Sequence, residues 1–290
     1  MNRELPTLSV IVPISTGAEE FLAQKEAFIA QRYPSKIEFI YIDSREDKAG
    51  RLAAMRSAKI IPLEKSEFRH GKARNDGVKL ATGEVVAFLS EDALPLGKLY
   101  FYNLVSALLD YGFPFAGVSA RHIPHSGKLL FSRYAVLTSP YNVPSGIKEL
   151  PLNNVASILW RNILIENPFP DDALFGEDIL FSQRVSEKGF KLGFAPRAVV
   201  LHSHQRSAKY TFLRYYADAY LWEGEGRRRN PAAEIENKKK VRFLPALATS
   251  KAPPLSLAEF LFKSTVAFFG AAYARHDRKK GVPPKSQGKV

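Results

Sequence analysis

The stretch that decides the fold is HGKARNDGVKLATGEVVAFLSEDALP, residues 70–95. Its first part, residues 72–81, has the composition of a helix, and Gly83 is placed to end that helix. The apolar run at residues 84–89 follows, and it stops at the polar residues 90–92. A short apolar run bounded by turn residues is typical of a buried strand. The stretch therefore predicts a helix, a buried strand and an acidic loop at the carboxyl end of that strand.

Segments of strand and helix character alternate on both sides of this stretch. Apolar runs rich in β-branched residues predict strands, and apolar residues spaced three and four apart predict helices. Their alternation predicts an α/β fold of Rossmann-like type, with a mostly parallel, doubly wound sheet. The predicted strands are residues 8–12, 37–42, 84–89 and 115–120, and the predicted helices are residues 19–31, 72–81 and 96–110.

Acidic residues follow two of these strands. Asp43 comes directly after the strand at residues 37–42, and Asp92 comes shortly after the strand at residues 84–89. Ligands of doubly wound sheets bind at the carboxyl ends of the strands, so we expect both carboxylates at one rim of the sheet. Turn formation or helix capping is the alternative explanation for either residue alone.

The second half of the chain has a less regular pattern. Residues 121–154 are rich in Pro, Gly, Ser and Tyr, and we expect a long irregular excursion over the active face. Residues 155–161 are compatible with a helix or a strand. Further segments are a helix at 177–188, strand-like runs at 191–194 and 198–201, an aromatic helix at 210–222 and an apolar helix at 257–274.

Two pairs of polar residues in this half are candidates for chemistry. Glu177 and Asp178 open a predicted helix, where one carboxylate can act as a general base; stabilisation of the helix N-terminus is the alternative. His202 and His204 follow a strand-like run, and imidazoles in such a place can bind a metal or lie beside a phosphate. Because alternate residues of a strand share a face, we expect only one of the two to face the site.

Composition excludes several classes of function. The chain has 290 residues and no cysteine, which excludes disulfide scaffolds, thiolate catalysis and Cys-ligated metals. A Walker loop, a G-x-G-x-x-G fingerprint and a G-x-S-x-G elbow are absent from the sequence. No apolar stretch approaches the roughly 20 residues of a spanning helix, so we expect a cytoplasmic protein.

Positive charge is concentrated in the C-terminal part. Residues 227–290 carry a net charge of +11, from 15 basic and 4 acidic residues, whereas the rest of the chain is nearly neutral. Such a segment favours an anionic partner. Its aromatic residues are gathered in one apolar segment instead of alternating with cations, so we expect no nucleic-acid binding. An anionic membrane surface, reached through residues 257–290, and a helix that simply packs on the protein are the two alternatives.

In this order, the pieces resemble the family 2 glycosyltransferases with the GT-A fold, and among them the bacterial rhamnosyltransferase-like subgroup. The resemblance covers about residues 7–222, which we expect to form the catalytic domain, with residues 223–290 as a basic extension. The motifs that carry it are Asp43-Ser44, the stretch at 70–95, PFPDDALFGED at 168–178 and AVVLHSH at 198–204.

The resemblance implies an activity. It implies inverting transfer of a sugar from a dTDP- or UDP-linked donor to a glycan or lipid-linked glycan acceptor in surface polysaccharide synthesis, at the cytoplasmic membrane face. Rhamnose or a related 6-deoxysugar is favoured by the subgroup. A UDP-hexose or UDP-N-acetylhexosamine donor, or an inactive protein that binds the nucleotide sugar, remain the alternatives.

The resemblance also implies roles for the residues. Asp178 is similar to the catalytic base, with Glu177 beside it, and Asp43 resembles the residue that reads the pyrimidine base. A Mg²⁺ or Mn²⁺ ion is implied at Asp92, together with His202 or His204. The implied donor-binding residues are Pro13, Ser15, Asp43, Arg74 and Glu91, and the residues expected on the acceptor side, where helix capping is the alternative, are Asn153 and Asn154.

The sequence departs from the family pattern in two places. Ser90 stands where the common Asp-x-Asp motif has its first aspartate, which leaves Asp92 as one carboxylate ligand. Arg45 and Glu46 follow Asp43-Ser44, where small residues are usual, so we expect an altered nucleotide pocket.

Overall fold

The computed structural model describes residues 4–15, 19–44, 58–125, 130–142, 149–173, 176–203, 207–222 and 254–282. The chain divides into two compact units. Unit 1 comprises Met1–His122, Val143–Ala173 and Glu177–His202, and unit 2 comprises Ile123–Asn142, Leu174–Gly176 and Ser203–Val290. The sequence places a boundary at residue 222, whereas the contacts assign helix α7 (Ala208–Trp222) to unit 2.

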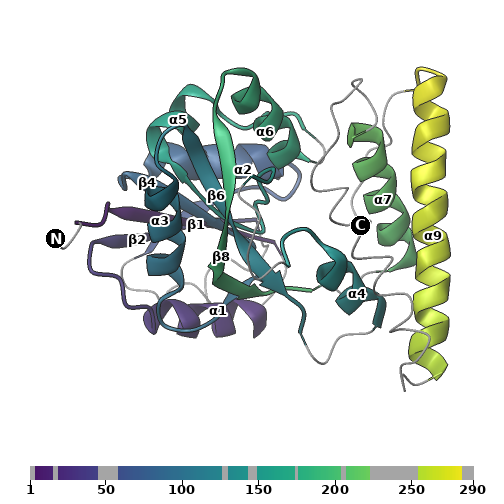
Figure 1. Ribbon diagram of the computed structural model, residues 1–290, viewed down its shortest axis with the longest axis horizontal. Helices are drawn as coiled ribbons and strands as arrows, with labels where there is room; N and C mark the ends of the chain where they lie inside the picture. The colour runs from purple at the N-terminus through teal and green to yellow at the C-terminus, as the bar shows by residue number, and fades with distance from the viewer. Residues whose placement is uncertain are drawn as a thin grey trace. The chain divides into compact units, whose positions relative to one another are not determined.

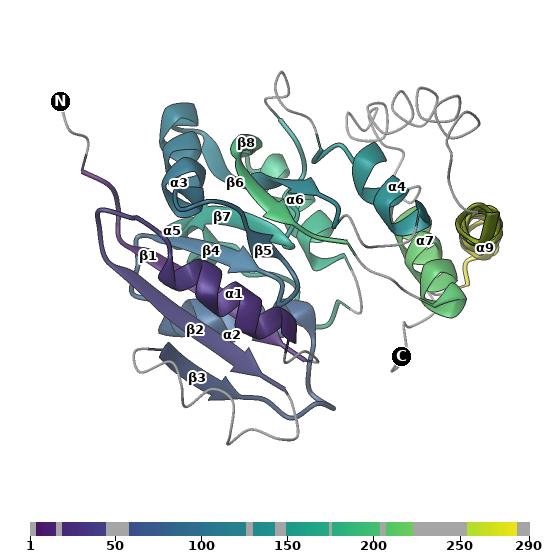
Figure 2. The same cartoon turned by 90° about the horizontal axis from the view of Figure 1, so that it is seen from below.

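Unit 1 is built on an eight-stranded sheet (Figure 1) with the order β3-β2-β1-β4-β7-β6-β8-β5, all of whose strands are labelled in Figure 2. The strands are β1 (Leu8–Ile14), β2 (Ile37–Asp43), β3 (Ala58–Pro62), β4 (Val85–Leu89), β5 (Leu94–Pro95), β6 (Phe115–Ile123), β7 (Ala156–Trp160) and β8 (Lys191–Leu201). Strands β3, β2, β1 and β4 are parallel to their neighbours within this group. Strand β7 is antiparallel to β4 and β6, and β5 is antiparallel to β8. The predicted α/β fold is confirmed, but only this first group of strands is parallel throughout.

Strand β7 reverses direction because the chain enters it from the rim at which β4 ends. Ala156, the first residue of β7, pairs with Leu89, the last residue of β4. The backbone N–H of Ser90 donates to the carbonyl of Val155 at 2.9 Å. The residues just before β7 therefore lie at the carboxyl ends of the parallel strands, where ligands of such sheets bind.

Helices cover both faces of the sheet (Figure 2). One face is covered by α1 (Glu19–Ile29) and α3 (Tyr100–Tyr111), and the other by α2 (His70–Leu80), α5 (Arg161–Glu166) and α6 (Glu177–Glu187). Strand β1 supplies both layers: Val10 and Val12 pack with the first set of helices, and Ile11 packs with the second. This follows from the two-residue period of a strand, and it explains why the run at residues 8–12 is apolar at nearly every position.

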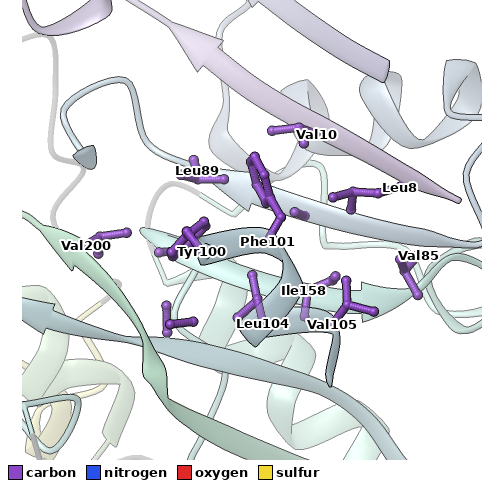
Figure 3. Packing of buried hydrophobic residues seen from close by; sticks show 14 of the residues in the cluster. Leu8, Val10, Val85, Leu89, Tyr100, Phe101, Leu104, Val105, Ile158 and Val200 are labelled. Atoms are coloured by element: carbon purple, nitrogen blue, oxygen red, sulfur yellow. The ribbon is translucent and has the colours of Figure 1, made fainter. Parts of the chain in front are cut away.

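The core under α3 includes residues of strands β1, β4, β7 and β8 (Figure 3). Phe101 and Leu104 of α3 are fully buried against a cluster that includes Val10 of β1, Leu89 of β4 and Ile158 of β7. Burying a side chain of this size contributes about 1.5–3 kcal/mol. The packing makes the strand ends of β1 and β4 parts of one rigid platform.

The structure corrects the expectation for residues 121–154. This segment is not irregular throughout, because β6 continues to Ile123 and helix α4 (Leu130–Thr138) follows. Helix α4 buries Phe131 and Tyr134 against Phe260 of helix α9 (Pro254–Lys279). The helix has a short apolar face whose partner, α9, is distant in the chain. The sequence of the segment therefore shows no clear helical periodicity.

Other predicted elements are confirmed or refined. Residues 155–161, whose sequence is compatible with a helix or a strand, contain strand β7 and then the start of α5 at Arg161. The two strand-like runs at 191–194 and 198–201 are one continuous strand, β8. Strand β3 was not predicted, since its Ala58–Pro62 segment has only partly buried or exposed side chains.

Unit 2 contains α4, α7 and α9. Helix α9 runs along α7 (Figure 1) and also contacts α4. The close approach of α9 to α7 requires Gly270, since a Cβ atom there would lie 2.4 Å from the carbonyl oxygen of Phe212. None of the helices in the described part of the chain is long and apolar enough to cross a membrane.

Candidate active site

The candidate site lies at the carboxyl ends of β2, β1 and β4. Strand β1 lies between the other two, and the connections through α1 and α2 cover opposite faces of the sheet. This is the switch point at which doubly wound sheets open a crevice for ligands. Asp43 ends β2 and the segment containing Asp92 follows β4, so the topology places both acids at this rim, as the sequence predicts.

Glu91 connects the ends of β1 and β4. One of its carboxylate oxygens accepts the backbone N–H of Ser15 at 2.9 Å, and the other accepts the Ser15 hydroxyl at 3.0 Å. Pro13 is buried two residues earlier, within β1. Two donor-side candidates, Ser15 and Glu91, thus bind each other and hold the loop after β4 against the end of β1.

Asp43 is completely buried at the end of β2. The next residue, Ser44, donates both its backbone N–H and its hydroxyl to the carbonyl of Ile14, at 2.9 and 3.0 Å. On the other side, the Asp43 carbonyl accepts the N–H of Leu63. The backbone around Asp43 is therefore held from both neighbouring strands, while Arg45 and Glu46 lie outside the described residues.

Arg74 of α2 and Glu177 of α6 form a buried ion pair. The Nη1 atom of Arg74 lies 2.7 Å from Oε1 of Glu177, and both side chains are less than one tenth exposed. The same guanidinium donates to the backbone carbonyls of His70 and Asn154. The Nη atoms of Arg74, a candidate donor-binding residue, therefore donate hydrogen bonds to groups of the protein itself.

The pair keeps Glu177 ionised. Burial by itself favours the neutral acid, but the nearby Arg74 and His70, a backbone N–H and the amide of Asn154 outweigh burial and hold the pKa of Glu177 below its usual value. An ionised Glu177 is a poor proton acceptor in a base role, since its charge is already stabilised by Arg74.

Asn154 connects this pair to Asp178. Its side-chain amide lies 3.4 Å from Glu177, and its amide oxygen accepts the hydroxyl of Ser157. Its backbone N–H donates to one carboxylate oxygen of Asp178 at 3.3 Å. Asp178 is only half-buried, in contrast to Glu177. Asn154 thus holds the first turn of α6 at the rim of the sheet, with Asp178 as its more accessible carboxylate.

Asn153 has a different surrounding. Its side-chain oxygen accepts the backbone N–H of Val155 at 3.0 Å, and its own N–H donates to the hydroxyl of Ser119. These bonds shape the turn that leads into β7. Asn153 thus forms a turn before a strand and does not cap a helix, whereas Asn154 belongs to the acidic cluster.

Asp92 and His202 lie together at the end of β8. The Nε2 atom of His202 is 3.7 Å from Oδ1 of Asp92. Two ligands of one cation at about 2.1 Å each lie roughly 3.0–4.2 Å apart, so the separation fits a shared Mg²⁺ or Mn²⁺. No group of three or more His, Cys, Asp or Glu suitable for a metal occurs in the described part of the chain. His204, the other histidine of the motif, lies outside those residues.

His122 is a neighbour of His202 that no sequence pattern predicts. It lies on β6, and its ring meets the ring of His202 edge to face with centroids 5.7 Å apart. Burial lowers the pKa of His122 to about 4, so its ring is neutral near pH 7 and adds no charge beside His202. Only the sheet order brings β6 next to β8; no local motif marks this residue.

The first turns of α2 contact the segment at residues 169–171, which leads to α6. Asn75 donates to the carbonyl of Phe169 and to Asp171 at 2.8 and 2.7 Å, and its side-chain oxygen accepts the N–H of Phe169. A Cβ atom on Gly71 would lie 2.2 Å from the carbonyl oxygen of Pro170. Gly71 and Asn75, both in the 70–95 stretch, therefore hold the segment that leads to α6 in position.

Comparison with known proteins places the chain in a family. Residues 9–164, more than half of the chain, match glycosyl transferase family 2. The O-antigen chain rhamnosyltransferases RfbN of Salmonella typhimurium and WbaN of Salmonella anatum are each 26% identical, over 63% and 73% of this chain and 62% and 71% of their own lengths. The chain thus matches less than two thirds of the length of RfbN.

A solved structure shares the fold. It is the mannosyltransferase PcManGT of Pyrobaculum calidifontis in complex with GDP-Man and Mn²⁺, with a TM-score of 0.63 and 18% identity, covering 95% of this chain and 88% of that one. At this identity the likeness concerns the fold alone. The sheet order, the acids at the strand ends and the match over residues 9–164 agree: the chain belongs to glycosyl transferase family 2.

Proposed function

We propose that the protein is an inverting glycosyltransferase that moves a sugar from a nucleoside-diphosphate donor to a glycan or lipid-linked glycan hydroxyl. The observation that carries the proposal is the contrast between the two acids at the start of α6. Glu177 is buried and paired with Arg74, while Asp178 is half-buried beside the backbone of Asn154. Different surroundings give adjacent carboxylates different roles, and here they leave Asp178 to take a proton.

The donor side of the proposal uses the ends of β1, β2 and β4. The nucleotide would bind in the crevice at this switch point, with Asp43 near the base. Ser15 and Glu91, bound to each other, would form its wall. Asp92 and His202 would hold a Mg²⁺ or Mn²⁺ ion, which when bound neutralises charge on the diphosphate.

In the proposed reaction Asp178 accepts the proton of the acceptor hydroxyl. The acceptor oxygen forms a bond to the anomeric carbon while the bond from that carbon to the diphosphate breaks on the opposite face. The electron pair of the broken bond leaves with the nucleoside diphosphate. Glu177 and Arg74 do not exchange protons; they hold the first turn of α6 in place. General-base assistance of this kind contributes about 10²–10⁴-fold to the rate.

The names of two relatives support one class of donor sugar. Both Salmonella relatives are named O-antigen chain rhamnosyltransferases, which supports rhamnose or a related 6-deoxysugar on dTDP, with UDP-linked hexoses as the second candidates. The proposal includes a place at the cytoplasmic face of a membrane, where a lipid-linked acceptor would be found.

A thermal-shift screen tests the donor site. The nucleotides dTDP, UDP, GDP and ATP are each added with Mn²⁺, with Mg²⁺ or with EDTA. A ligand that binds only the folded protein at 100 times its Kd stabilises it by about 2.7 kcal/mol. We expect dTDP or UDP to raise the Tm in a metal-dependent way. The proposal is wrong if no nucleoside diphosphate changes the Tm.

Turnover separates an enzyme from an inactive binder. The stabilising nucleotide is supplied as its sugar conjugate, and release of nucleoside diphosphate is followed with and without a glycan acceptor. We expect acceptor-dependent release, and the anomeric configuration of the product, read by NMR, to be opposite to that of the donor. Binding without any release would favour the inactive nucleotide-sugar binder instead.

A further inference from the structure

Helix α9 carries two different sides. Its inner side is buried at positions three and four residues apart and packs on α7 and α4 within unit 2. Its outer side carries large apolar side chains that remain more than half exposed. We call this set the aromatic face, and its members are Leu261, Phe262, Phe268, Phe269 and Tyr273.

The aromatic face is not needed to build unit 2. Phe260 and Ala267, on the inner side, join the buried cluster with α4. In contrast, Phe262 and Phe268 are 59% and 65% exposed. Large exposed apolar patches on a soluble protein mark sites of interaction with a protein or a membrane. The face is therefore a candidate docking surface, and the charges around it decide the partner.

Charge on α9 is separated between the two sides. Its two acids face inward: Glu259 pairs with Lys263 at 2.7 Å, and Asp277 accepts the hydroxyl of Tyr216 at 3.0 Å. Lys263 is buried with Glu259 on the inner side, whereas the exposed cations of the helix, among them Arg275 and Lys279, lie outside that side. At helical spacing, Lys279 and Lys280 continue the strip of the aromatic face after its last ring, and both are exposed.

We propose that the aromatic face of α9 docks on an anionic lipid bilayer, with the helix lying in the plane of the interface. The rings would enter the boundary between headgroups and acyl chains, and the basic end would meet the lipid phosphates. Each lysine near an anionic surface adds about fivefold to binding. The inference deepens the proposed function, on which it rests only for the lipid-linked acceptor that such docking would serve.

Vesicle flotation of the full chain tests the proposal. The vesicles are phosphatidylcholine alone or mixed with phosphatidylglycerol, at low and high salt, with no nucleotide present. We expect binding to the anionic vesicles that weakens at high salt. A soluble fraction that anionic vesicles do not change at low salt would overturn the proposal.

Two variants separate the aromatic and basic parts. One is the triple change Phe262→Ser, Phe268→Ser and Phe269→Ser, and its matched control is Phe113→Ser, since Phe113 is 89% exposed in unit 1. The other is Lys279→Glu with Lys280→Glu, and its control is Lys36→Glu with Lys98→Glu at exposed sites of unit 1. We expect each α9 variant to lose at least tenfold in vesicle binding, with the Tm and the binding of both controls unchanged.

The other outcomes are equally clear. Full vesicle binding by the triple Phe variant would show that the face does not dock, and would overturn the proposal. A concentration-dependent dimer that the triple variant abolishes, without vesicle binding, would assign the face to a second copy of the chain. Because the assay contains no nucleotide, it can fail while dTDP or UDP still stabilises the same preparation, so failure here is distinct from failure of the proposed function.

Discussion

At the scale of single residues, the informative contrast is between neighbours with the same chemistry. Glu177 and Asp178 are adjacent carboxylates, but the first lies in a buried pair with Arg74, whereas the second accepts the backbone N–H groups of Asn154 and Ile179. The difference in burial and in bonding partners therefore suits Glu177 to a structural role and Asp178 to a chemical one, although both lie in one helical turn.

Replacing the proposed base tests this division. We expect Asp178→Asn to lower kcat by about 10²–10⁴-fold, because it removes the proton acceptor, while nucleotide binding by thermal shift stays unchanged. Asp172→Asn, at an exposed acid of the preceding loop, serves as the matched control and should leave kcat unchanged. Near-normal turnover of Asp178→Asn would remove this residue from the role of base.

Breaking the ion pair tests the structural role. Glu177→Gln leaves the Arg74 guanidinium buried without its counter-charge, and loss of one partner of a buried pair costs about 3–5 kcal/mol. We expect a loss of that size in the free energy of unfolding, measured by urea denaturation. The surface pair of Lys79 with Asp76 is the control: Lys79→Ala should cost less than about 1 kcal/mol. Equal costs for the two variants would contradict the structural role.

The same pair predicts a dependence on pH. The pKa of Glu177 is lower in the folded protein than in the unfolded chain, so unfolding takes up a proton in acid. Its stabilising contribution is present above the unfolded-state pKa of about 4.3 and is lost as the pH falls through the folded-state value. Between pH 6 and about 3, we expect the wild type to lose stability more steeply than Glu177→Gln. Parallel curves would contradict this assignment.

At the scale of elements, the position at which α6 begins depends on contacts made by the first turns of α2. Gly71 allows the carbonyl of Pro170 to approach, and Asn75 binds Phe169 and Asp171 on the same segment. These contacts of α2 thus fix the path of the segment that leads into the first turn of α6, where Glu177 and Asp178 lie. A change at Gly71 should therefore act at a distance on the site.

Gly71→Ala tests this coupling. Its added methyl group would meet backbone at 2.2 Å, and such overpacking costs about 1–3 kcal/mol. We expect that loss in chemical denaturation, together with a lower kcat. Lys72→Ala, on the next and partly exposed residue, should change neither by a comparable amount. An unchanged kcat in folded Gly71→Ala would show that the entry to α6 does not depend on this contact.

At the scale of the whole molecule, ligand binding is coupled to global stability. If Asp92 and His202 hold the ion that accompanies the diphosphate, a nucleotide should stabilise the fold only while metal is present. We expect EDTA to abolish the dTDP- or UDP-induced rise in Tm, and Asp92→Asn to do the same with metal present. A nucleotide shift that survives both treatments would show that this pair does not hold the ion.

Much of unit 1 is predictable from local sequence. The strands β1, β2 and β4 are continuous apolar runs because parallel strands are buried on both faces, so their ends, and with them Asp43 and the residues after β4, can be located without a structure. Glu177 and Asp178 were found because an acidic pair opens a helical pattern. Strand β3 is not evident from the sequence because its side chains are only partly buried or exposed, and helix α4 is not evident because its partner α9 is distant in the chain.

The sequence by itself determined the α/β class, the parallel strands, the rim that collects their terminal acids and the basic, aromatic character of the C-terminal helix, since all of these are written in local runs and periods. Only the tertiary structure decided what each polar residue binds. Arg74 pairs with Glu177 across 103 positions of the chain, and His122 reaches His202 through the order of the strands. Such contacts depend on the burial of a charge and its choice of a distant partner, which no local pattern encodes.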